Sequence, residues 1–251
     1  MKTLKIVVLT ANIDSHDASV PVIPSDWENV FLIVFTSSYS TETTVQHIGN
    51  TLRVSIRNSP LLARQISRIP KINPLFLFNT SFKPPSIFPD YSKVSLAIRA
   101  FIGKEFDYLV WHDANCSLLS YTHLLAICSS VPTNGWGIFA HPDRNCLYQE
   151  ARAAKGLSYV CNEILKQQLS AYKIKKMPLN YGLYACGFFV RSYQSLYSSR
   201  VLWDLWMHEF LRWVPRDQIS LPYCLFQHPL HRPTLLGKFT WTNELFAFKP
   251  H

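Results

Sequence analysis

The sequence predicts an α/β protein, with a mixed and mainly parallel sheet flanked by helices. Short apolar runs that end in polar residues recur along the chain, as at residues 5–10 and 30–35, and have the composition of buried strands. Segments with helical spacing alternate with them, a pattern typical of α/β proteins. No repeat, linker or low-complexity tract is evident, so we expect one domain over residues 1–251.

The N-terminal half supplies two strands and at least one helix. Residues 91–103 have apolar side chains at helical spacing, including Val94, Ile98 and Phe101. Pro60 would interrupt a helix, because proline lacks the N–H that helix pairing needs. The predicted elements are strands at 5–10 and 30–35, a helix over 51–68 interrupted near Pro60, a strand or extended segment at 71–78, and a helix at 91–103.

The C-terminal half continues the alternation. Residues 106–115 begin as an aromatic and β-branched strand and end in polar side chains. Residues 193–213 carry the apolar stripe of an amphipathic helix. Further predicted elements are helices at 121–129, at 147–175 (two helices that meet near Gly156) and after Pro215, and strands at 135–140 and 184–190.

Composition excludes several classes of protein. The formal charge of +9 suits an anionic partner, but the basic residues are dispersed and no nucleic-acid-binding motif is present, so no nucleic acid is expected. No apolar run reaches the roughly 18–20 residues that span a bilayer, and no signal peptide is evident. None of the six cysteines forms a C-x-x-C pair. We expect a cytoplasmic protein, with peripheral association at the cytosolic face of a membrane as an option.

The strand at residues 106–115 ends in a candidate cation site. Asp113 and Asn115 are two residues apart, and on an extended backbone their side chains point the same way. A carboxylate and an amide oxygen so placed can bind Mn²⁺ or Mg²⁺ and the phosphates it carries. Asp and Asn also end strands simply because they favour turns and helix caps. Two ligands leave the shell incomplete, so His231, or several waters, would complete it.

Other polar residues are placed to reach a ligand. Asp217 opens a helix, where the dipole keeps a carboxylate ionised and suited to act as a base or to orient an acceptor. Arg144, past the end of a strand with His141, can pair with a phosphate. Lys71 can reach a diphosphate, and Gly187 allows close backbone approach. Each also has an ordinary structural explanation, as a turn, a solvated lysine or tight packing.

Motifs in this order resemble the glycosyltransferase-like (hexosyltransferase) family that includes the plant seed-mucilage and pollen-turgor proteins. An apolar strand that ends in Asp-x-Asp or Asp-x-Asn is also common in sugar-nucleotide glycosyltransferases. The resemblance covers nearly the whole chain. The matching stretches are residues 5–14, 69–74, 107–115, 141–151, 168–172, 177–178, 203–213 and 216–220.

The resemblance implies a GT-A-type fold, a Rossmann-like α/β domain that binds a nucleotide sugar. It adds His141, Arg144 and Glu150 to the expected donor site, and Asp217 with Gln218 to the expected catalytic residues. Asn115 stands where other transferases have a second Asp, which weakens the expected metal affinity. Residues of the first loop would bind the nucleoside: Thr10, Ala11, Asn12 and Asp14.

The predicted function is divalent-metal-dependent transfer of a sugar from a nucleoside-diphosphate sugar, foremost a UDP-sugar, to a glycan, lipid-linked or protein acceptor. Asp113 and Asn115 would bind the cation and diphosphate. One alternative is a non-catalytic relative that binds nucleotide sugars or glycans, which Asn115 favours. A second is a nucleotidyltransferase, which the absence of glycine from residues 10–14 disfavours.

Overall fold

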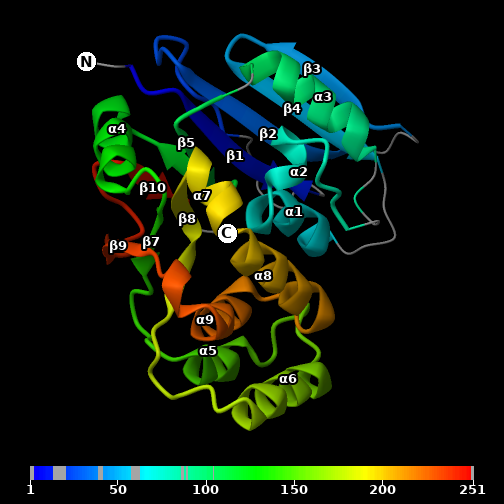
Figure 1. Cartoon of the computed structure of the whole chain (residues 1–251), viewed down its shortest axis with the longest axis vertical. Helices are drawn as coiled ribbons and strands as arrows, with labels where there is room; N and C mark the ends of the chain where they lie inside the picture. Colours follow the sequence, from blue (N-terminus) through cyan, green and yellow to red (C-terminus); the bar gives the residue numbers. More distant parts are fainter. Residues whose placement is uncertain are drawn as a thin grey trace.

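An eight-stranded mixed sheet forms the centre of the protein (Figure 1), as expected for an α/β fold. The computed structural model describes residues 3–13, 21–38, 42–57, 63–85, 88, 90–103 and 105–249. The strand order is β3-β4-β2-β1-β5-β8-β7-β9. The strands are β1 (Ile6–Asn12), β2 (Val30–Ser38), β3 (Thr44–Ile48), β4 (Thr51–Arg57), β5 (Tyr108–His112), β7 (Trp136–Ala140), β8 (Tyr184–Ser192) and β9 (Thr234–Lys238).

Strands β4, β2, β1 and β5 run parallel and form the Rossmann-like half of the sheet. Strands β3 and β8 are antiparallel to their neighbours, while β9 is parallel to β7. The carboxyl ends of β1 and β5 therefore lie at the same edge of the sheet. In open α/β sheets this edge is where ligands bind.

Strand β1 is buried on both faces, which explains its continuous apolar sequence. Val7 and Leu9 belong to one hydrophobic cluster, and Ile6 and Val8 belong to the other. This division follows the alternation of side chains along an extended strand. The two clusters are the two faces of the sheet.

Most helices cover the face that carries Val7 and Leu9. The opposite face is covered by α4 and by the small sheet formed by β6 (Cys116–Leu118) and β10 (Phe246–Phe248). No helix among the described residues is long and apolar enough to cross a membrane. The helices are α1 (Ala63–Ile72), α2 (Leu75–Phe78), α3 (Tyr91–Ile102), α4 (Tyr121–Ser130), α5 (Leu147–Ala154), α6 (Asn162–Ile174), α7 (Tyr193–Ser198), α8 (Arg200–Arg212) and α9 (Asp217–Gln227), with a 3₁₀ turn η2 (Pro229–His231).

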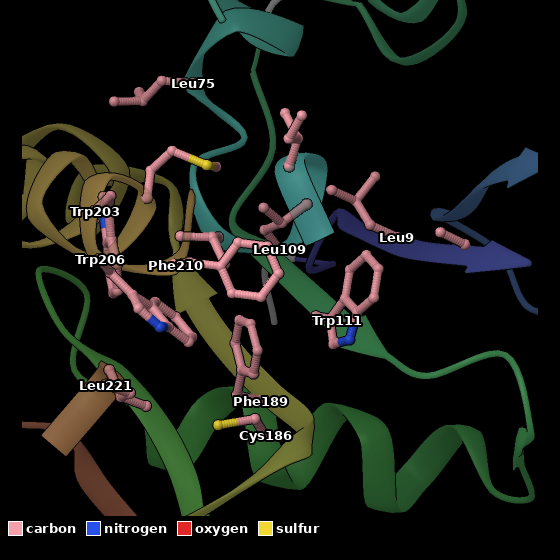
Figure 2. Close-up of a cluster of buried hydrophobic side chains, with 14 of the residues drawn as sticks. Leu9, Leu75, Leu109, Trp111, Cys186, Phe189, Trp203, Trp206, Phe210 and Leu221 are labelled. Carbon is pink, nitrogen blue, oxygen red and sulfur yellow. The ribbon is translucent and has the colours of Figure 1, made fainter. Parts of the chain in front are cut away.

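Aromatic packing among β5, β8 and α8 holds the strand that leads to Asp113. Trp111 of β5 lies opposite Phe189 of β8, and both are buried. Figure 2 shows these two rings on the side of the sheet that also carries Trp206 and Phe210 of α8. Buried aromatic rings of this size hold the strand ends firmly, because interiors pack at nearly crystalline density.

Three predicted elements were wrong. Residues 51–57 form β4, whose side chains alternate between buried Leu52, Val54 and Ile56 and partly exposed neighbours. Residues 71–78 are helical rather than extended, because the end of α1 and all of α2 lie there. The helix predicted at 193–213 is two helices that meet at Ser199. Residues 58–62, around the expected break at Pro60, lie outside the described part of the chain.

The remaining predicted helices and strands are confirmed, with boundaries that differ by a few residues. The two helices expected to meet near Gly156 are α5 and α6, and the helix expected after Pro215 is α9. The short strands β3, β6, β9 and β10 were not predicted. Each is at most five residues long and sits at the margin of the fold, where the sequence signal is weak.

Candidate active site

A cavity of about 750 Å³ opens at the carboxyl ends of β1 and β5. This volume suits a small organic ligand. Parts of the chain that are distant in sequence meet around it, from α1 near residue 64 to the C-terminal segment near residue 248. The polar side chains that line it are Arg64, Ser67, Arg68, Lys71, Asp113, Asn115, His141, Asp143, Arg144, Ser158, Tyr159, Arg216, Asp217 and Gln218.

Helix α1 presents three cationic side chains to the cavity. Arg64, Arg68 and Lys71 are spaced at i, i+4 and i+7, which places them on one helical face. The guanidinium of Arg191 on β8 donates to the carbonyl oxygens of Lys71 and Ile72 at 2.8 and 3.0 Å. Since the last carbonyls of a helix lack partners within it, Arg191 anchors the end of α1 that carries Lys71.

Asp113 follows β5 directly, and its backbone N–H donates to the carbonyl of Gly187 at 2.8 Å. Lys71 Nζ lies 3.3 Å from its Oδ1, and Trp111 Nε1 donates to the same oxygen at 2.9 Å. Arg68 Nη2 lies 3.5 Å from Oδ2. Burial alone would raise the pKa of the Asp113 carboxyl, but Arg68 and Lys71 outweigh it and hold the pKa below its usual value.

Asp217 is the first residue of α9 and is nearly closed to solvent. Lys71 Nζ donates to its Oδ2 at 2.6 Å, and Arg68 Nε lies 3.5 Å from the same oxygen. Burial opposes ionisation, but Lys71, Arg68 and Arg64 hold the pKa of the Asp217 carboxyl well below its usual range. Asp217 is therefore a fixed negative charge and a weak base in this state.

A second charged cluster adjoins the α1 cations, because Arg216 donates to the Tyr159 hydroxyl at 3.1 Å and Arg64 stacks on the same ring. Glu150 is buried on α5 and accepts a forked pair of bonds from Arg216 at 2.9 and 2.6 Å. Its other oxygen accepts from Arg144 Nε at 2.9 Å. Glu150 does not line the cavity; it positions two arginines that do. Burial alone would lower the pKa of Arg216, but Glu150 raises it above the ordinary value.

His141 lies beside this cluster. Its Nδ1 accepts from the backbone N–H groups of Asp143 and Arg144 at 3.1 and 3.2 Å, which shapes the turn after β7. Burial and the charge of Arg144 lower the pKa of His141. The histidine is therefore neutral near pH 7 and contributes hydrogen bonds to the rim rather than charge.

Strand β8 is irregular where it passes the cavity. Its register with β7 shifts between Ile138 and Phe139, so that Cys186, Gly187 and Phe188 lie in a bulge. A Cβ atom on Gly187 would meet the Phe248 ring at 3.2 Å and Asp113 Oδ2 at 3.7 Å. The glycine permits this close approach, and bulges next to sites are a common way to aim side chains.

Aromatic side chains border the cavity on the side of the β6–β10 sheet. Phe239 and Phe248 pack edge to face at 5.2 Å, and Trp241 lies 5.4 Å from Phe239. Trp241 remains 65% exposed, which is unusual for the largest apolar side chain. The exposed Trp241 ring offers a face on which a nucleobase or a sugar ring can stack, with the two phenylalanine rings packed edge to face against it.

The structure brings together many of the residues that sequence analysis proposed for the site. Those lining the cavity are Ala11, Lys71, Asp113, Asn115, His141, Arg144, Gly187, Asp217 and Gln218. Thr10 and Asn12 are buried in β1 and do not line it, and Asp14 lies outside the described residues. Because strand side chains alternate, only Ala11 and Ile13 face the cavity from this end of β1.

Asp113 and Asn115 line the cavity, but the third proposed ligand of a divalent cation does not. His231 does not border the cavity, and its Nδ1 lies 3.1 Å from Ser199 Oγ. The Asn115 side chain donates to the carbonyl of Lys249 at 2.9 Å. Asp113 is already paired with Lys71 and Arg68. Over the described ranges, no group of three His, Cys, Asp or Glu side chains is placed to bind a metal ion. This donor set does not fit a divalent cation.

Sequence analysis missed Arg64 and Arg68, because it merged α1 with β4 and extended the next segment from Lys71. The i, i+4, i+7 spacing of the three basic residues was the signal that could have found them. Arg216 was noted only as part of a motif. Trp241 and Phe248 had no local signal, since only the folded chain brings the C-terminal segment to β5.

Comparison with known families identified a matching family model. The family model described as TOD1/MUCI70, glycosyltransferase-like domain, matches residues 93–243, which is more than half of the chain. The match includes Asp113, His141, Arg144 and Asp217 and leaves out β1 and α1. No curated protein matches the chain. The resemblance drawn from the sequence motifs is thus confirmed over this range.

Proposed function

The chain belongs to the TOD1/MUCI70 glycosyltransferase-like family, and we propose that it transfers a sugar from a UDP-sugar to a glycan acceptor. Membership supports a general glycosyltransferase role, with a sugar donor and a glycan acceptor. The identity of the donor and the acceptor chemistry go beyond membership and are proposed here. The observation that carries the proposal is the charge of the cavity at the carboxyl ends of β1 and β5.

Among the residues that the structure describes, five basic side chains line this cavity, against three carboxylates. Arg64, Arg68 and Lys71 come from α1, while Arg144 and Arg216 belong to the adjoining cluster around Glu150. A nucleoside diphosphate carries two or more negative charges. A single guanidinium group can donate two parallel hydrogen bonds to phosphate oxygens. The excess of positive charge supports a diphosphate ligand.

We propose that the base of the nucleotide stacks on the aromatic side of the cavity. Trp241 is exposed there, and Phe239 and Phe248 pack edge to face against it. A base on these rings would direct its diphosphate toward α1 across the cavity. A uracil has fewer polar edges to satisfy than a purine, which suits a mainly apolar platform.

In the reaction, the bond between the anomeric carbon and the β-phosphate oxygen breaks, and the electron pair leaves with the nucleoside diphosphate. The acceptor hydroxyl oxygen bonds to the anomeric carbon and loses its proton. Asp217 holds a negative charge close to where positive charge develops on the sugar, and Gln218 lies beside it. If the configuration at the anomeric carbon is inverted, Asp217 accepts the proton. If the configuration is retained, the departing diphosphate accepts it.

The test measures release of nucleoside diphosphate from UDP-, GDP- and dTDP-sugars, with a mixture of glycan acceptors. We expect release from a UDP-sugar that Asp217→Asn lowers by at least about 100-fold. Asp26→Asn serves as the control, because it removes an exposed carboxylate that is distant from Asp217 in sequence and does not line the cavity. Absence of both release and nucleotide binding would refute the donor site.

A second candidate is a relative that binds nucleotide sugars without turnover. The tight pairing of Asp217 with Lys71 at 2.6 Å favours it, because a carboxylate so engaged is a poor base. It predicts UDP binding with no release for any acceptor. Calorimetric titration with UDP in parallel with the release assay distinguishes the two candidates.

A further inference from the structure

We infer that the chain binds the diphosphate of its donor without a divalent cation, because the basic face of α1 takes the place of the metal. This basic face consists of Arg64, Arg68 and Lys71. The inference rests on the proposed function, since it concerns how the same cavity binds a nucleoside diphosphate. It replaces the metal site that the strand-end Asp113 and Asn115 suggest from sequence.

The first support is the state of the carboxylate that a metal would need. Both oxygens of Asp113 face cationic or N–H groups: Lys71 and Trp111 on Oδ1, and Arg68 on Oδ2. A divalent cation at Asp113 would lie beside the charges of Lys71 and Arg68. Since like charges repel, the two arrangements compete, and the protein already contains the first.

The second support is a hydrogen-bond donor on α1 that has no partner within the described protein. Arg68 Nε is buried and has no hydrogen-bond partner among the described residues, although it lies 3.5 Å from Asp217 Oδ2. A buried guanidinium N–H without a partner is costly, so a ligand that accepts from it gains affinity. Arg68 also lines the cavity, so its guanidinium can turn toward a phosphate oxygen bound there.

The third support is that the basic face is held in place before a ligand arrives. Arg64 stacks on the ring of Tyr159 at 3.8 Å and donates to the carbonyl of Pro215 at 2.9 Å. Lys71 is held between Asp113 and Asp217, and Arg191 secures the end of α1. Preorganised charges stabilise a developing anion without further reorganisation, which is the contribution a metal would otherwise make.

Asp113 then has a positioning role. It aims Lys71 and Arg68 at the cavity and does not bind a metal. When the anomeric carbon–oxygen bond breaks, the electron pair stays on the β-phosphate oxygen, and the cations of α1 neutralise the charge of the departing nucleoside diphosphate. No oxidant, reductant or further reactant is needed.

The experiment is calorimetric titration of the full chain with UDP, first in excess EDTA and then with Mn²⁺ or Mg²⁺. We expect the same Kd within about twofold under the three conditions. Arg68→Gln should weaken UDP binding by about 10- to 100-fold in EDTA, because it removes charge-assisted hydrogen bonds to phosphate. Lys166→Gln removes one positive charge from the exposed face of α6 and should leave the Kd unchanged.

Uridine provides the matched ligand without phosphates. If α1 binds the diphosphate, Arg68→Gln and Arg64→Gln should weaken UDP and leave uridine binding almost unchanged. Circular dichroism of each variant verifies folding, and Arg64, which is partly exposed, supplies a second variant should Arg68→Gln fail to fold.

The outcomes are distinct. Binding of UDP that requires Mn²⁺ and is lost in Asp113→Asn would overturn this inference while leaving the proposed function intact. Binding that is equal in EDTA but insensitive to Arg64 and Arg68 would also overturn it. Failure of UDP and of the other nucleoside diphosphates to bind under every condition would refute the proposed function itself.

Discussion

Lys71 and Asp217 are separated by 146 residues in the chain, yet Lys71 Nζ lies 2.6 Å from Asp217 Oδ2. Both side chains are almost fully buried, at 1% and 5% exposure. The pair joins the end of α1 to the start of α9 across the floor of the cavity. It therefore links the stability of the fold to the charge of the candidate active site.

Removing the Lys71 side chain charge should destabilise the folded protein. Lys71→Met leaves the buried Asp217 carboxylate without its closest partner, and we expect a loss of about 3–5 kcal/mol in the free energy of unfolding. Urea denaturation measures the loss. Lys71→Met combined with Asp217→Asn should cost less than the sum of the two single changes, because the double variant leaves no orphan charge at this contact. Additive losses would show that the two residues are not coupled; Lys166→Met is the exposed control.

Glu150 should contribute more to donor binding than to the stability of the fold. Glu150→Gln weakens the bonds that hold Arg144 and Arg216, both of which retain some access to solvent. The arginines can relax toward water, so we expect a stability loss of about 1–3 kcal/mol. Donor KM should rise while kcat changes less, because the arginines are displaced but remain charged. Glu163→Gln, on the exposed side of α6, is the control, and an unchanged KM would contradict the positioning role.

Stability should rise with pH between about 5.5 and 7, around the ordinary pKa of histidine. Burial lowers the pKa of His112 in the folded protein, so the unfolded chain binds a proton at a higher pH than the folded one. The unfolded state therefore binds more protons in this window, and the free energy of unfolding increases as pH rises. The contribution is complete above the unfolded pKa and is lost as pH falls toward the folded pKa.

Urea denaturation across this window tests the sign. In His112→Gln the slope should become smaller, because one buried group no longer titrates on unfolding. The remaining slope should include His141, whose pKa is lowered by burial and by Arg144. His208→Gln removes a histidine from an exposed position on α8 as the control. A slope that stays the same in His112→Gln would contradict the assignment.

Gly187→Ala should impair activity without unfolding the protein. The new methyl group would lie 3.2 Å from the ring of Phe248, so that ring must move at the edge of the cavity. We expect a stability loss of about 1 kcal/mol and a clear fall in kcat/KM. Gly135→Ala is a matched control, because its methyl group would meet Pro132 at 3.3 Å away from the cavity lining. Equal effects of both changes on activity would contradict a specific role for Gly187.

Trp241→Ala should weaken nucleotide binding and leave stability almost unchanged. The side chain is 65% exposed, so its removal takes little surface out of the core. Loss of one stacking contact should raise the Kd for UDP by about 5- to 100-fold. Leu179→Ala removes an exposed apolar side chain elsewhere, and the two variants can be compared by calorimetry and thermal unfolding.

Local patterns predicted most of the fold. The buried strands β1, β2, β5 and β8 have continuous apolar sequences, because both of their faces are covered. One error arose where a strand-like pattern of apolar residues is followed closely by a helix-like one. Leu52, Val54 and Ile56 alternate as in a strand, and the amphipathic helix α1 begins shortly after them. Reading both as one helix hid β4 and the spacing of Arg64 and Arg68.

The sequence alone determined the α/β class, the strand end that carries Asp113 and the helix start that carries Asp217, since backbone preferences and burial leave a periodic record in the chain. The tertiary structure decided what these residues contact. Lys71, Asp113 and Asp217 converge because α1 packs on β1, α9 packs on β8, and β5 lies between these two strands in the sheet. Ion pairs between distant segments have no local signature in the sequence. For the same reason His231, which the sequence suggested as a metal ligand, lies beside Ser199 instead.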